Sequence, residues 1–259
     1  MILAETALRG YNLEATDGEL GVIKDCLFDD RYWNLRWFVV DTGPWLIGRK
    51  ILIHPSAVTH VDLESEKIFV NLTKRQIEDS PSATTDEPVS REWQNNLYDY
   101  YGWDSMWGNA SYYIGYPDIP LARGGPLTLG GETSDLHVPG SEHEYGLDAG
   151  DPHLRSANAL RGYHVDATDG AIGHVGNFLF DDESWTIRYI VVDTKVWWFG
   201  QQVLLSPVGV RDIAAVDHAI HVKISREQVK SSPPWDPSEQ IHQDYERRLQ
   251  QHYEWADRG

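Results

Sequence analysis

The chain has 259 residues, 41% of them hydrophobic and 12% aromatic, which excludes wholesale disorder because there is ample apolar surface to bury. Asp and Glu number 40 against 22 Lys and Arg, and the formal net charge of −18 argues against binding nucleic acid or docking on anionic lipid. The single cysteine, Cys26, excludes an internal disulfide and a multi-cysteine metal site. Because neither a signal-peptide pattern nor a long apolar segment is evident, we expect a soluble, cytoplasmic protein with no membrane insertion.

Four segments of the chain occur twice, 152 residues apart, since residue 160 repeats residue 8. They are Leu8-Arg9-Gly10-Tyr11, Ala15-Thr16-Asp17-Gly18, Leu27-Phe28-Asp29-Asp30 and Val39-Val40-Asp41-Thr42. The offset continues without a gap to Trp103 and its counterpart Trp255. Two copies are too few for a solenoid, and each has the size of a small domain. The sequence therefore predicts a duplicated domain at 1–103 and 154–259, joined by a linker at 104–153.

Each copy has the pattern of short strands separated by tight turns. Asp17-Gly18 and Asp169-Gly170 supply the positive φ of a hairpin turn. Apolar residues fill both alternating sets over 20–28 and 37–40, which favours strands of a small closed barrel or sandwich. Reversals are predicted at 29–30 and 43–44, with further strands at 45–53 and 67–72. We expect a mainly β protein of two small barrels, each enclosing its own core.

Helices are predicted only late in each copy. Thr73 and Gln76, like Ser225 and Gln228, have the spacing of a capping box, and a proline ends each short helix. A longer helix is predicted at 237–255, with a counterpart near the end of the first copy. The segment 104–153 is acidic and rich in glycine and proline, which is typical of a linker.

An ordered set of motifs resembles a known family. In the first copy the set is Gly10-Tyr11, Asp17-Gly18, Gly21, Asp29-Asp30, Trp33, Arg36, Val39-Val40-Asp41-Thr42 and Pro55, and the second copy repeats it from Gly162-Tyr163 to Asp193-Thr194. This set resembles the PRC-barrel family, small β-barrel domains of the photosynthetic reaction-centre H subunit and of a ribosome maturation factor. The resemblance covers about three quarters of the chain and implies two PRC barrels in tandem. We do not expect either role to apply in full, because this sequence shows neither the membrane helix of the reaction-centre subunit nor the separate N-terminal domain of the maturation factor.

Polar residues that recur in both copies admit two interpretations. The Asp29-Asp30 pair and its repeat could act as catalytic carboxylates, but we favour bonds to backbone N–H groups in a turn. Arg36 and Arg188 lie in apolar strands, where an aspartate partner from Asp17 or Asp41, or from their repeats, would stabilise them; an anion site is the alternative. The residues assigned a structural polar role are Asp17, Asp169, Asp29, Asp181, Arg36, Arg188, Asp41 and Asp193.

The repeat also tests for metal and nucleophile sites. His54, His60, His164 and His174 each align with a different residue type in the other copy, so no metal site is built into the shared fold. His218 with His221, and His137 with His143, remain possible ligands. Cys26 aligns with Phe178, which indicates a core filler. No phosphate loop or nucleophile motif occurs, and we expect no catalytic activity, no cofactor and no metal.

Aromatic residues near strand ends are candidate interface anchors, although packing within the chain is the alternative. These candidates are Trp45, Trp197, Trp198, Phe199, Trp103 and Trp107. We expect a non-catalytic adaptor or assembly module that binds an unidentified protein partner, with a homodimer as a further candidate assembly. The alternatives are a cytoplasmic accessory of a photosynthetic or respiratory electron-transfer complex, which the resemblance implies, and a small-ligand or metal sensor. A hydrolase and a ribosome-maturation role are more distant.

Overall fold

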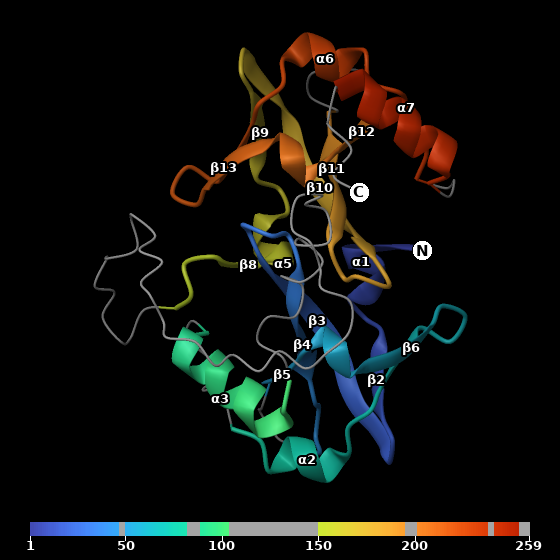
Figure 1. Ribbon diagram of the computed structural model, residues 1–259, viewed down its shortest axis with the longest axis vertical. Coiled ribbons are helices and arrows are strands. Elements are labelled where there is room, and N and C mark those ends of the chain that lie inside the picture. The colour runs from blue at the N-terminus through green and yellow to red at the C-terminus, as the bar shows by residue number, and fades with distance from the viewer. Residues whose placement is uncertain (47–49, 82–88, 104–149, 195–200, 238–240, 254–259) are drawn as a thin grey trace, which may run out of the picture.

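The computed structural model describes residues 1–46, 50–81, 89–103, 150–194, 201–237 and 241–253, and the predicted linker lies outside these ranges from 104 to 149. In this part of the chain the fold is mainly β, with two mixed sheets and short helices (Figure 1). From the first copy come β1 (Ile2–Ala4), α1 (Glu5–Leu8), β2 (Asn12–Ala15), β3 (Gly18–Asp29), β4 (Leu35–Asp41), β5 (Lys50–Ile53), the 3₁₀ turn η1 (Pro55–Ala57), β6 (Val58–Asp62), β7 (Lys67–Val70), α2 (Lys74–Glu78) and α3 (Arg91–Tyr101).

The second copy repeats these elements in the same order. Its elements are β8 (Leu154–Ser156), α5 (Ala157–Leu160), β9 (His164–Ala167), β10 (Gly170–Asp181), β11 (Ile187–Asp193), β12 (Gln202–Leu205), the 3₁₀ turn η2 (Pro207–Gly209), β13 (Val210–Ala214), β14 (Ala219–Val222), α6 (Arg226–Lys230) and α7 (Gln243–Tyr253). Each lies 152 residues after its counterpart, as β8 at 154 and β1 at 2 illustrate. Two such similar sheet units fit the predicted duplication.

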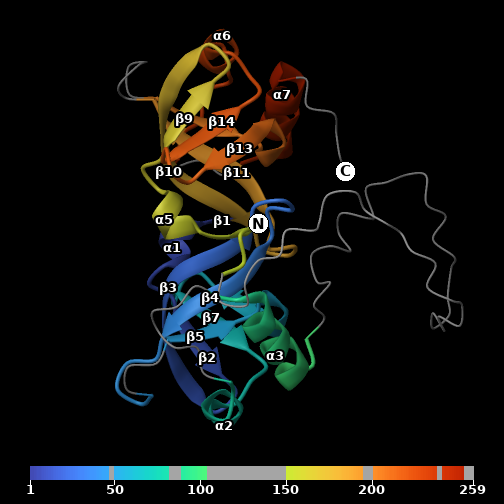
Figure 2. The same ribbon diagram turned by 90° about the vertical axis from the view of Figure 1, so that its left-hand side faces the viewer.

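The two sheets exchange their first strands. The first sheet has the order β5-β4-β3-β2-β7-β6, and β8 of the second copy pairs with its β3. The second sheet has the order β12-β11-β10-β9-β14-β13, and β1 of the first copy pairs with its β10. Helices α1 and α5 follow these strands and lie in the middle of the molecule, between the sheets (Figure 2). Each copy therefore contributes one strand to the other copy's sheet.

Equivalent hydrogen bonds from side chains and backbone stabilise the exchanged strands in both sheets. Asn177 on β10 accepts from the Thr6 amide at 3.3 Å, and the equivalent Asp25 on β3 accepts from the Asn158 amide at 3.1 Å. The Leu35 amide donates to the Trp185 carbonyl at 2.8 Å. In return, the Ile187 amide donates to the Trp33 carbonyl at 2.7 Å. These bonds satisfy backbone groups that an isolated copy would leave unpaired at the junction.

One hydrophobic core runs through both copies, which differs from the expected pair of separate cores. Phe28 and Phe178, both fully buried, meet across the junction with ring centroids 5.4 Å apart. Phe38 of the first copy packs edge-to-face on Trp185 of the second at 5.1 Å. The exchange explains this continuity, because it places both copies' apolar strands in one interior.

The sheets are not closed into barrels, so the expectation of closed barrels is wrong. Of the strand predicted over 45–53, the structure shows β5 at Lys50–Ile53 and a turn at 45–46, while residues 47–49 lie outside the described part. The strands predicted at 20–28, 37–40 and 67–72 correspond to β3, β4 and β7. Gly21 bends β3 toward β4 at a φ of +146°, and a Cβ there would lie 2.1 Å from the Asp41 carbonyl oxygen. Only glycine permits that approach.

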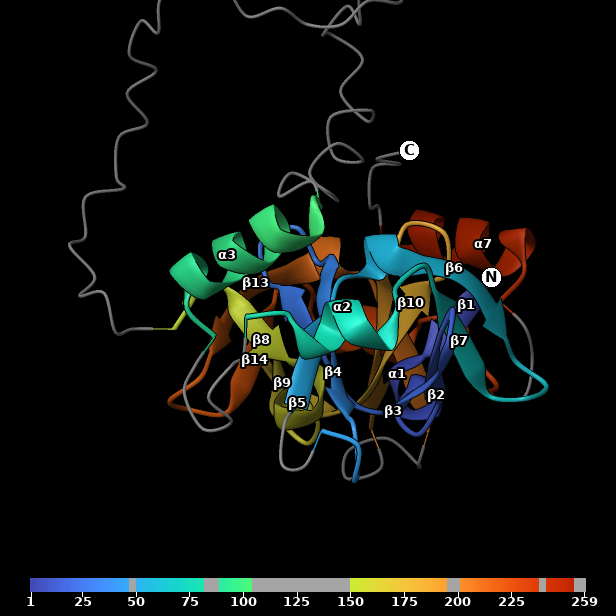
Figure 3. The ribbon, with the colours of Figure 1, turned by 90° about the horizontal axis from the view of Figure 1, so that it is seen from below.

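The helix predictions hold at the start of each short helix. Thr73 and Gln76 form a complete capping box at α2, and Ser225 and Gln228 form another at α6, as predicted. The predicted helix at 237–255 is shorter, since α7 begins at Gln243 in the structure. Helices α3 and α7 lie on the same face of the molecule (Figure 3). Among the described helices, none is both long and apolar enough to cross a membrane.

Candidate functional site

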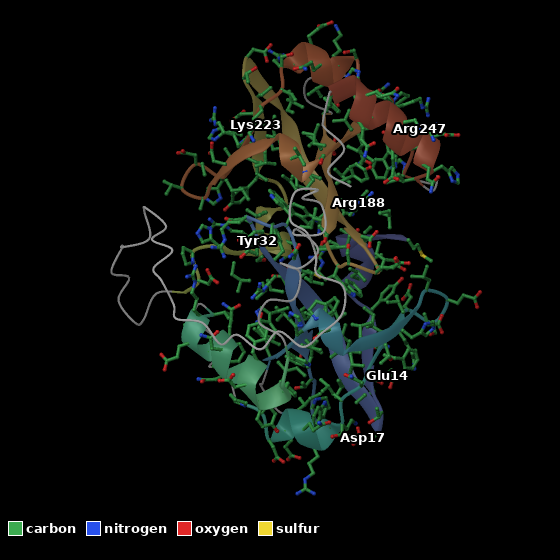
Figure 4. The ribbon with its side chains drawn as sticks, in the orientation of Figure 1. Glu14, Asp17, Tyr32, Arg188, Lys223 and Arg247 are labelled. Carbon is green, nitrogen blue, oxygen red and sulfur yellow. The ribbon has the colours of Figure 1, made fainter. Side chains whose placement is uncertain are left out.

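A groove of about 1000 Å³ lies where the two copies meet. One wall comes from the β3–β4 turn at Asp30–Trp33 and from β8 with His153 and Arg155. The other wall comes from the start of β11, the η2 turn, β13, the end of β14 and helix α7. In Figure 4, Tyr32 lies between the two halves, with Arg188 and Lys223 on the second half. The groove depends on the strand exchange, because β8 brings Arg155 onto the first sheet.

Among the charged side chains that line this groove, cations outnumber carboxylates. Its cations are Arg31, Arg155, Arg188, Arg211 and Lys223, whereas Asp30 and Asp212 are its carboxylates. Asp29 and Glu246 lie behind and pair with two of the arginines, so the local balance is still positive by one. In a chain of net charge −18, this groove is a local exception.

Each arginine is held by a carboxylate. The Arg155 Nε atom lies 2.6 Å from Asp30 Oδ2, and the other oxygen of this carboxylate lies 2.9 Å from His153 Nδ1. The Arg211 Nε atom lies 2.7 Å from Asp212, and Arg188 lies 3.3 Å from Glu246. These contacts orient the guanidinium planes and use only part of their five N–H donors.

Asp29 anchors the turn that carries Arg31 and Tyr32. Its buried carboxylate accepts from the Arg31 side chain at 2.8 Å and from the backbone amides of Arg31 and Tyr32 at 2.9 and 3.2 Å. Burial alone would raise the pKa of Asp29, but the Arg31 bonds outweigh it and the pKa is lowered. The carboxylate is therefore ionised at neutral pH and fixes the turn, as a turn aspartate does.

The positive charges are specific to this groove and are not part of the repeat. When the two copies are aligned at the offset of 152 residues, four of the five cations align with non-basic residues of the other copy. Arg31 corresponds to Glu183, Arg155 to Leu3, Arg211 to Thr59 and Lys223 to Asn71, while Arg188 alone matches an arginine, Arg36. Since both copies form the same sheet, the fold itself does not require these charges.

Side-chain size explains why the equivalent space in the first copy is filled. Three lining residues of the groove, Tyr189, Ser206 and Gln250, correspond to the larger Trp37, His54 and Tyr98. There, the Trp37 ring lies 5.4 Å from His54 and 5.2 Å from Tyr98. Trp103 adds a further contact at 5.6 Å from His54. Smaller side chains in the second copy leave the groove open between the described residues.

The two arginines predicted as an ion-pair partner or an anion site have different surroundings. Arg36 donates to the Tyr98 hydroxyl at 2.6 Å instead of to Asp17 or Asp41. Arg188 lines the groove and pairs with Glu246, instead of Asp169 or Asp193. Of the two arginines, Arg188 is therefore the one for which an anion site stays a prediction.

The repeated aspartates lie at turns and helix starts. Asp17 accepts from the Lys74 amide at 2.8 Å and Asp169 from the Arg226 amide at 2.7 Å, so each fixes the start of a short helix. Asp181 accepts from the Glu183 and Ser184 amides, and Asp41 from the Gly43 amide. Asp193 ends β11. Of this set, only Arg188 lies in the groove lining.

The described aromatic candidates make contacts within the chain. The Trp45 indole donates to the Leu20 carbonyl at 2.7 Å, and Lys74 lies over its ring at 5.3 Å. Trp103 stacks on Tyr101 with centroids 4.1 Å apart. Both are half-buried. The other candidates, Trp107, Trp197, Trp198 and Phe199, lie outside the described residues, and an interface at these positions stays a prediction.

No metal-type cluster of three His, Cys, Asp or Glu side chains occurs in the part of the chain that the structure describes. Cys26 is fully buried, and burial raises the pKa of its thiol well above the ordinary value. His54 is also fully buried. His221 bonds to Asp212 at 2.6 Å at the margin of the groove.

The sequence interpretation missed four of the five groove cations. Arg31, Arg155, Arg211 and Lys223 lie in separate stretches that only the fold brings together. A comparison of the two copies for differences in charge, in place of identities, would have singled them out.

Comparison with known proteins concerns mainly the second copy. Residues 153–229 match the PRC-barrel domain family. A protein of Deinococcus radiodurans described only as "Uncharacterized protein" is 31% identical over 74 residues. That match covers 29% of this chain and 26% of the relative, so it spans about a quarter of the relative's length. Residues 153–229, which include the β8, β11, β13 and β14 parts of the groove, are thus similar to a PRC-barrel domain.

Proposed function

We propose that the protein is a non-catalytic adaptor that binds a protein partner in the groove between its two sheets. The observation that carries this proposal is the set of groove cations that the repeat does not share. Charges that the fold does not need, gathered at one concave surface, favour a binding role over a structural one.

The lining supports recognition of a protein. Arginine, tyrosine and tryptophan dominate the energetic centres of protein interfaces, and Arg31, Tyr32 and Trp33 follow one another in the groove wall. The arginines are oriented before binding by their carboxylate partners, which reduces the entropy lost when a partner binds. The PRC-barrel match of residues 153–229 is compatible with such a role.

A small-ligand sensor is the second candidate, because about 1000 Å³ is at the upper end of ordinary small-molecule sites. A sensor predicts that millimolar phosphate or citrate raises the melting temperature of the purified protein. An adaptor for a protein segment predicts little change with these anions.

The adaptor proposal is tested by co-purification from the native cell with a groove variant. We expect Lys223→Glu combined with Arg188→Gln to lower the recovery of a specific partner at least tenfold, since each change removes a cation from the groove. The control combines Arg247→Glu with Arg75→Gln, which changes the net charge equally at exposed positions on α7 and α2. Equal recovery with both variants, or the absence of any partner, would contradict the proposal.

A further inference from the structure

We propose that the groove recognises an acidic peptide segment whose carboxylates bind to cations on both walls and whose apolar side chain lies on the floor between them. This inference rests on the adaptor role and names the chemistry of the partner segment. The inference rests on the positions of the groove cations. Arg31 and Arg155 lie on one wall, and Arg188, Arg211 and Lys223 lie on the opposite wall.

The cations come from elements that the fold holds rigidly. Arg155 lies on β8, which pairs with β3, and Arg211 lies on β13, which pairs with β14. Lys223 follows β14 directly, and its backbone amide donates to the Gly209 carbonyl at 2.8 Å. Backbone bonds between Leu35 and Trp185 and between Ile187 and Trp33 join the two walls, so charged groups of a ligand would meet donors in fixed positions.

The donors needed for carboxylates remain available. Arg155 and Arg211 each use Nε in their ion pairs, which leaves their terminal N–H groups for a bidentate contact. The exposed Lys223 ammonium makes no hydrogen bond or ion pair with another described residue. It is the cation whose use by a ligand would disrupt no contact within this part of the chain.

The floor of the groove is apolar. Val210 and Ile213 are half-buried and give it accessible apolar surface, above the buried side chains Ile187, Ile224 and Leu249. Val208 is 40% exposed, which makes it the most accessible of the apolar side chains that line the groove. A ligand made only of charges would leave this surface uncovered, whereas a segment that alternates acidic and apolar residues covers it and gains hydrophobic free energy.

The net charge of the whole molecule selects against long polyanions. At physiological ionic strength charges beyond about 8 Å are screened, so a short segment inside the groove interacts mainly with the local cations. A nucleic acid or a lipid surface extends past the groove and would meet the acidic exterior, where the balance is negative. A short acidic segment of a protein is therefore the favoured occupant.

The test uses the full-length protein and a fluorescein-labelled peptide of alternating glutamate and phenylalanine, followed by fluorescence anisotropy at physiological salt. We expect saturable binding of this peptide, and at least tenfold weaker binding when glutamine replaces every glutamate. Arg211→Gln combined with Lys223→Gln should raise the Kd at least tenfold. The control, Arg75→Gln combined with Arg247→Gln, should leave the Kd unchanged, and thermal unfolding confirms that all variants fold.

Any other outcome of this binding experiment contradicts the inference or the adaptor proposal. Equal binding of the glutamate and glutamine peptides, equal Kd values for both double variants, or tighter binding of a labelled single-stranded RNA or of phosphatidylserine vesicles would overturn the inference. If the peptide fails while partner recovery still depends on Lys223 and Arg188, the acidic ligand class is wrong and the adaptor role stands. If the peptide binds in the groove and no partner is recovered from the cell, the adaptor role is wrong and the ligand class stands.

Discussion

Phe178→Ala is expected to lower the free energy of unfolding of the whole chain by about 3–5 kcal/mol, the usual range for a buried phenylalanine. The Phe178 ring is fully buried and lies 5.4 Å from Phe28 of the other copy. Because the core is continuous, both sheets should lose stability together. Chemical denaturation followed by circular dichroism measures the loss, and hydrogen exchange of β3 and β10 amides shows whether it is shared.

Phe69→Ala is the matched control, since Phe69 is half-buried on β7 beside His60, away from the junction. Phe69→Ala should lower the free energy of unfolding by less than Phe178→Ala does. A double-mutant cycle of Phe28→Ala with Phe178→Ala should give a coupling of about 0.5–1.5 kcal/mol for the aromatic pair. Loss of protection confined to β10 would show that the two sheets unfold independently.

The second large effect is expected at acid pH and originates at His54. This imidazole is fully buried between Trp37 and Tyr98, with Nδ1 at 2.8 Å from the Ser56 hydroxyl. Burial, and then the nearby Arg36 charge, lower the pKa of His54 from 6.5 to about 3. The folded state therefore resists protonation that the unfolded chain accepts.

The direction of the pH dependence of stability follows from this difference in the pKa of His54 between the folded and unfolded states. Above pH 6.5 His54 is neutral in both states and has no effect on the pH dependence. As pH falls from 6.5 to about 3, the unfolded chain gains a proton and stability is lost, by up to about 5 kcal/mol. His54→Gln should remove this part of the slope. Denaturation midpoints of the two proteins should run parallel between pH 7 and 9 and diverge below 6.5; parallel curves down to pH 3 would contradict the assignment.

Local patterns in the sequence predicted the strands and the short helices. Strands β4 and β7 contain short apolar runs, apolar residues occupy both alternating sets of β3, and the capping boxes at Thr73 and Ser225 are complete in a stretch of four residues. Such signals need no knowledge of tertiary structure. The equivalence of the described elements at one offset made each prediction in one copy a prediction in the other.

The strand exchange could not be predicted from the same patterns. Strand β1 pairs with residues 179–181, Leu-Phe-Asp, and the first copy carries the identical Leu27-Phe28-Asp29 in its own β3. A three-residue strand facing two identical partners carries no local information about which it joins. The choice is made by the junction, where Phe28, Phe178 and Trp185 are buried. The prediction of closed barrels was wrong because the two edge strands of each sheet, β5 and β6 in the first and β12 and β13 in the second, do not pair with each other among the described residues.

The groove follows from the exchange, and for that reason only Arg188 among its cations was a sequence candidate. Arg31 comes from the first copy and Arg155 from the strand that crosses to it, whereas Arg211 and Lys223 stay with the second sheet. Residues more than 120 positions apart, such as Asp30 and Arg155, are joined only after folding.

The exchange can be measured directly by disulfide cross-linking. Residues Ala4 and Leu179 are paired across β1 and β10, and paired Cα atoms in antiparallel strands lie within the range that a disulfide spans. Without the exchange, Ala4 would instead face Leu27, which pairs with Ser156 here. The one native cysteine, Cys26, is buried and should not interfere.

Ala4→Cys with Leu179→Cys is compared with Ala4→Cys with Leu27→Cys under mild oxidation, and the product is read by mass spectrometry of the monomer. We predict an intramolecular disulfide in the first variant and little in the second. A disulfide that forms between positions 4 and 27, or that joins two chains at positions 4 and 179, would contradict the exchanged arrangement on which the groove depends.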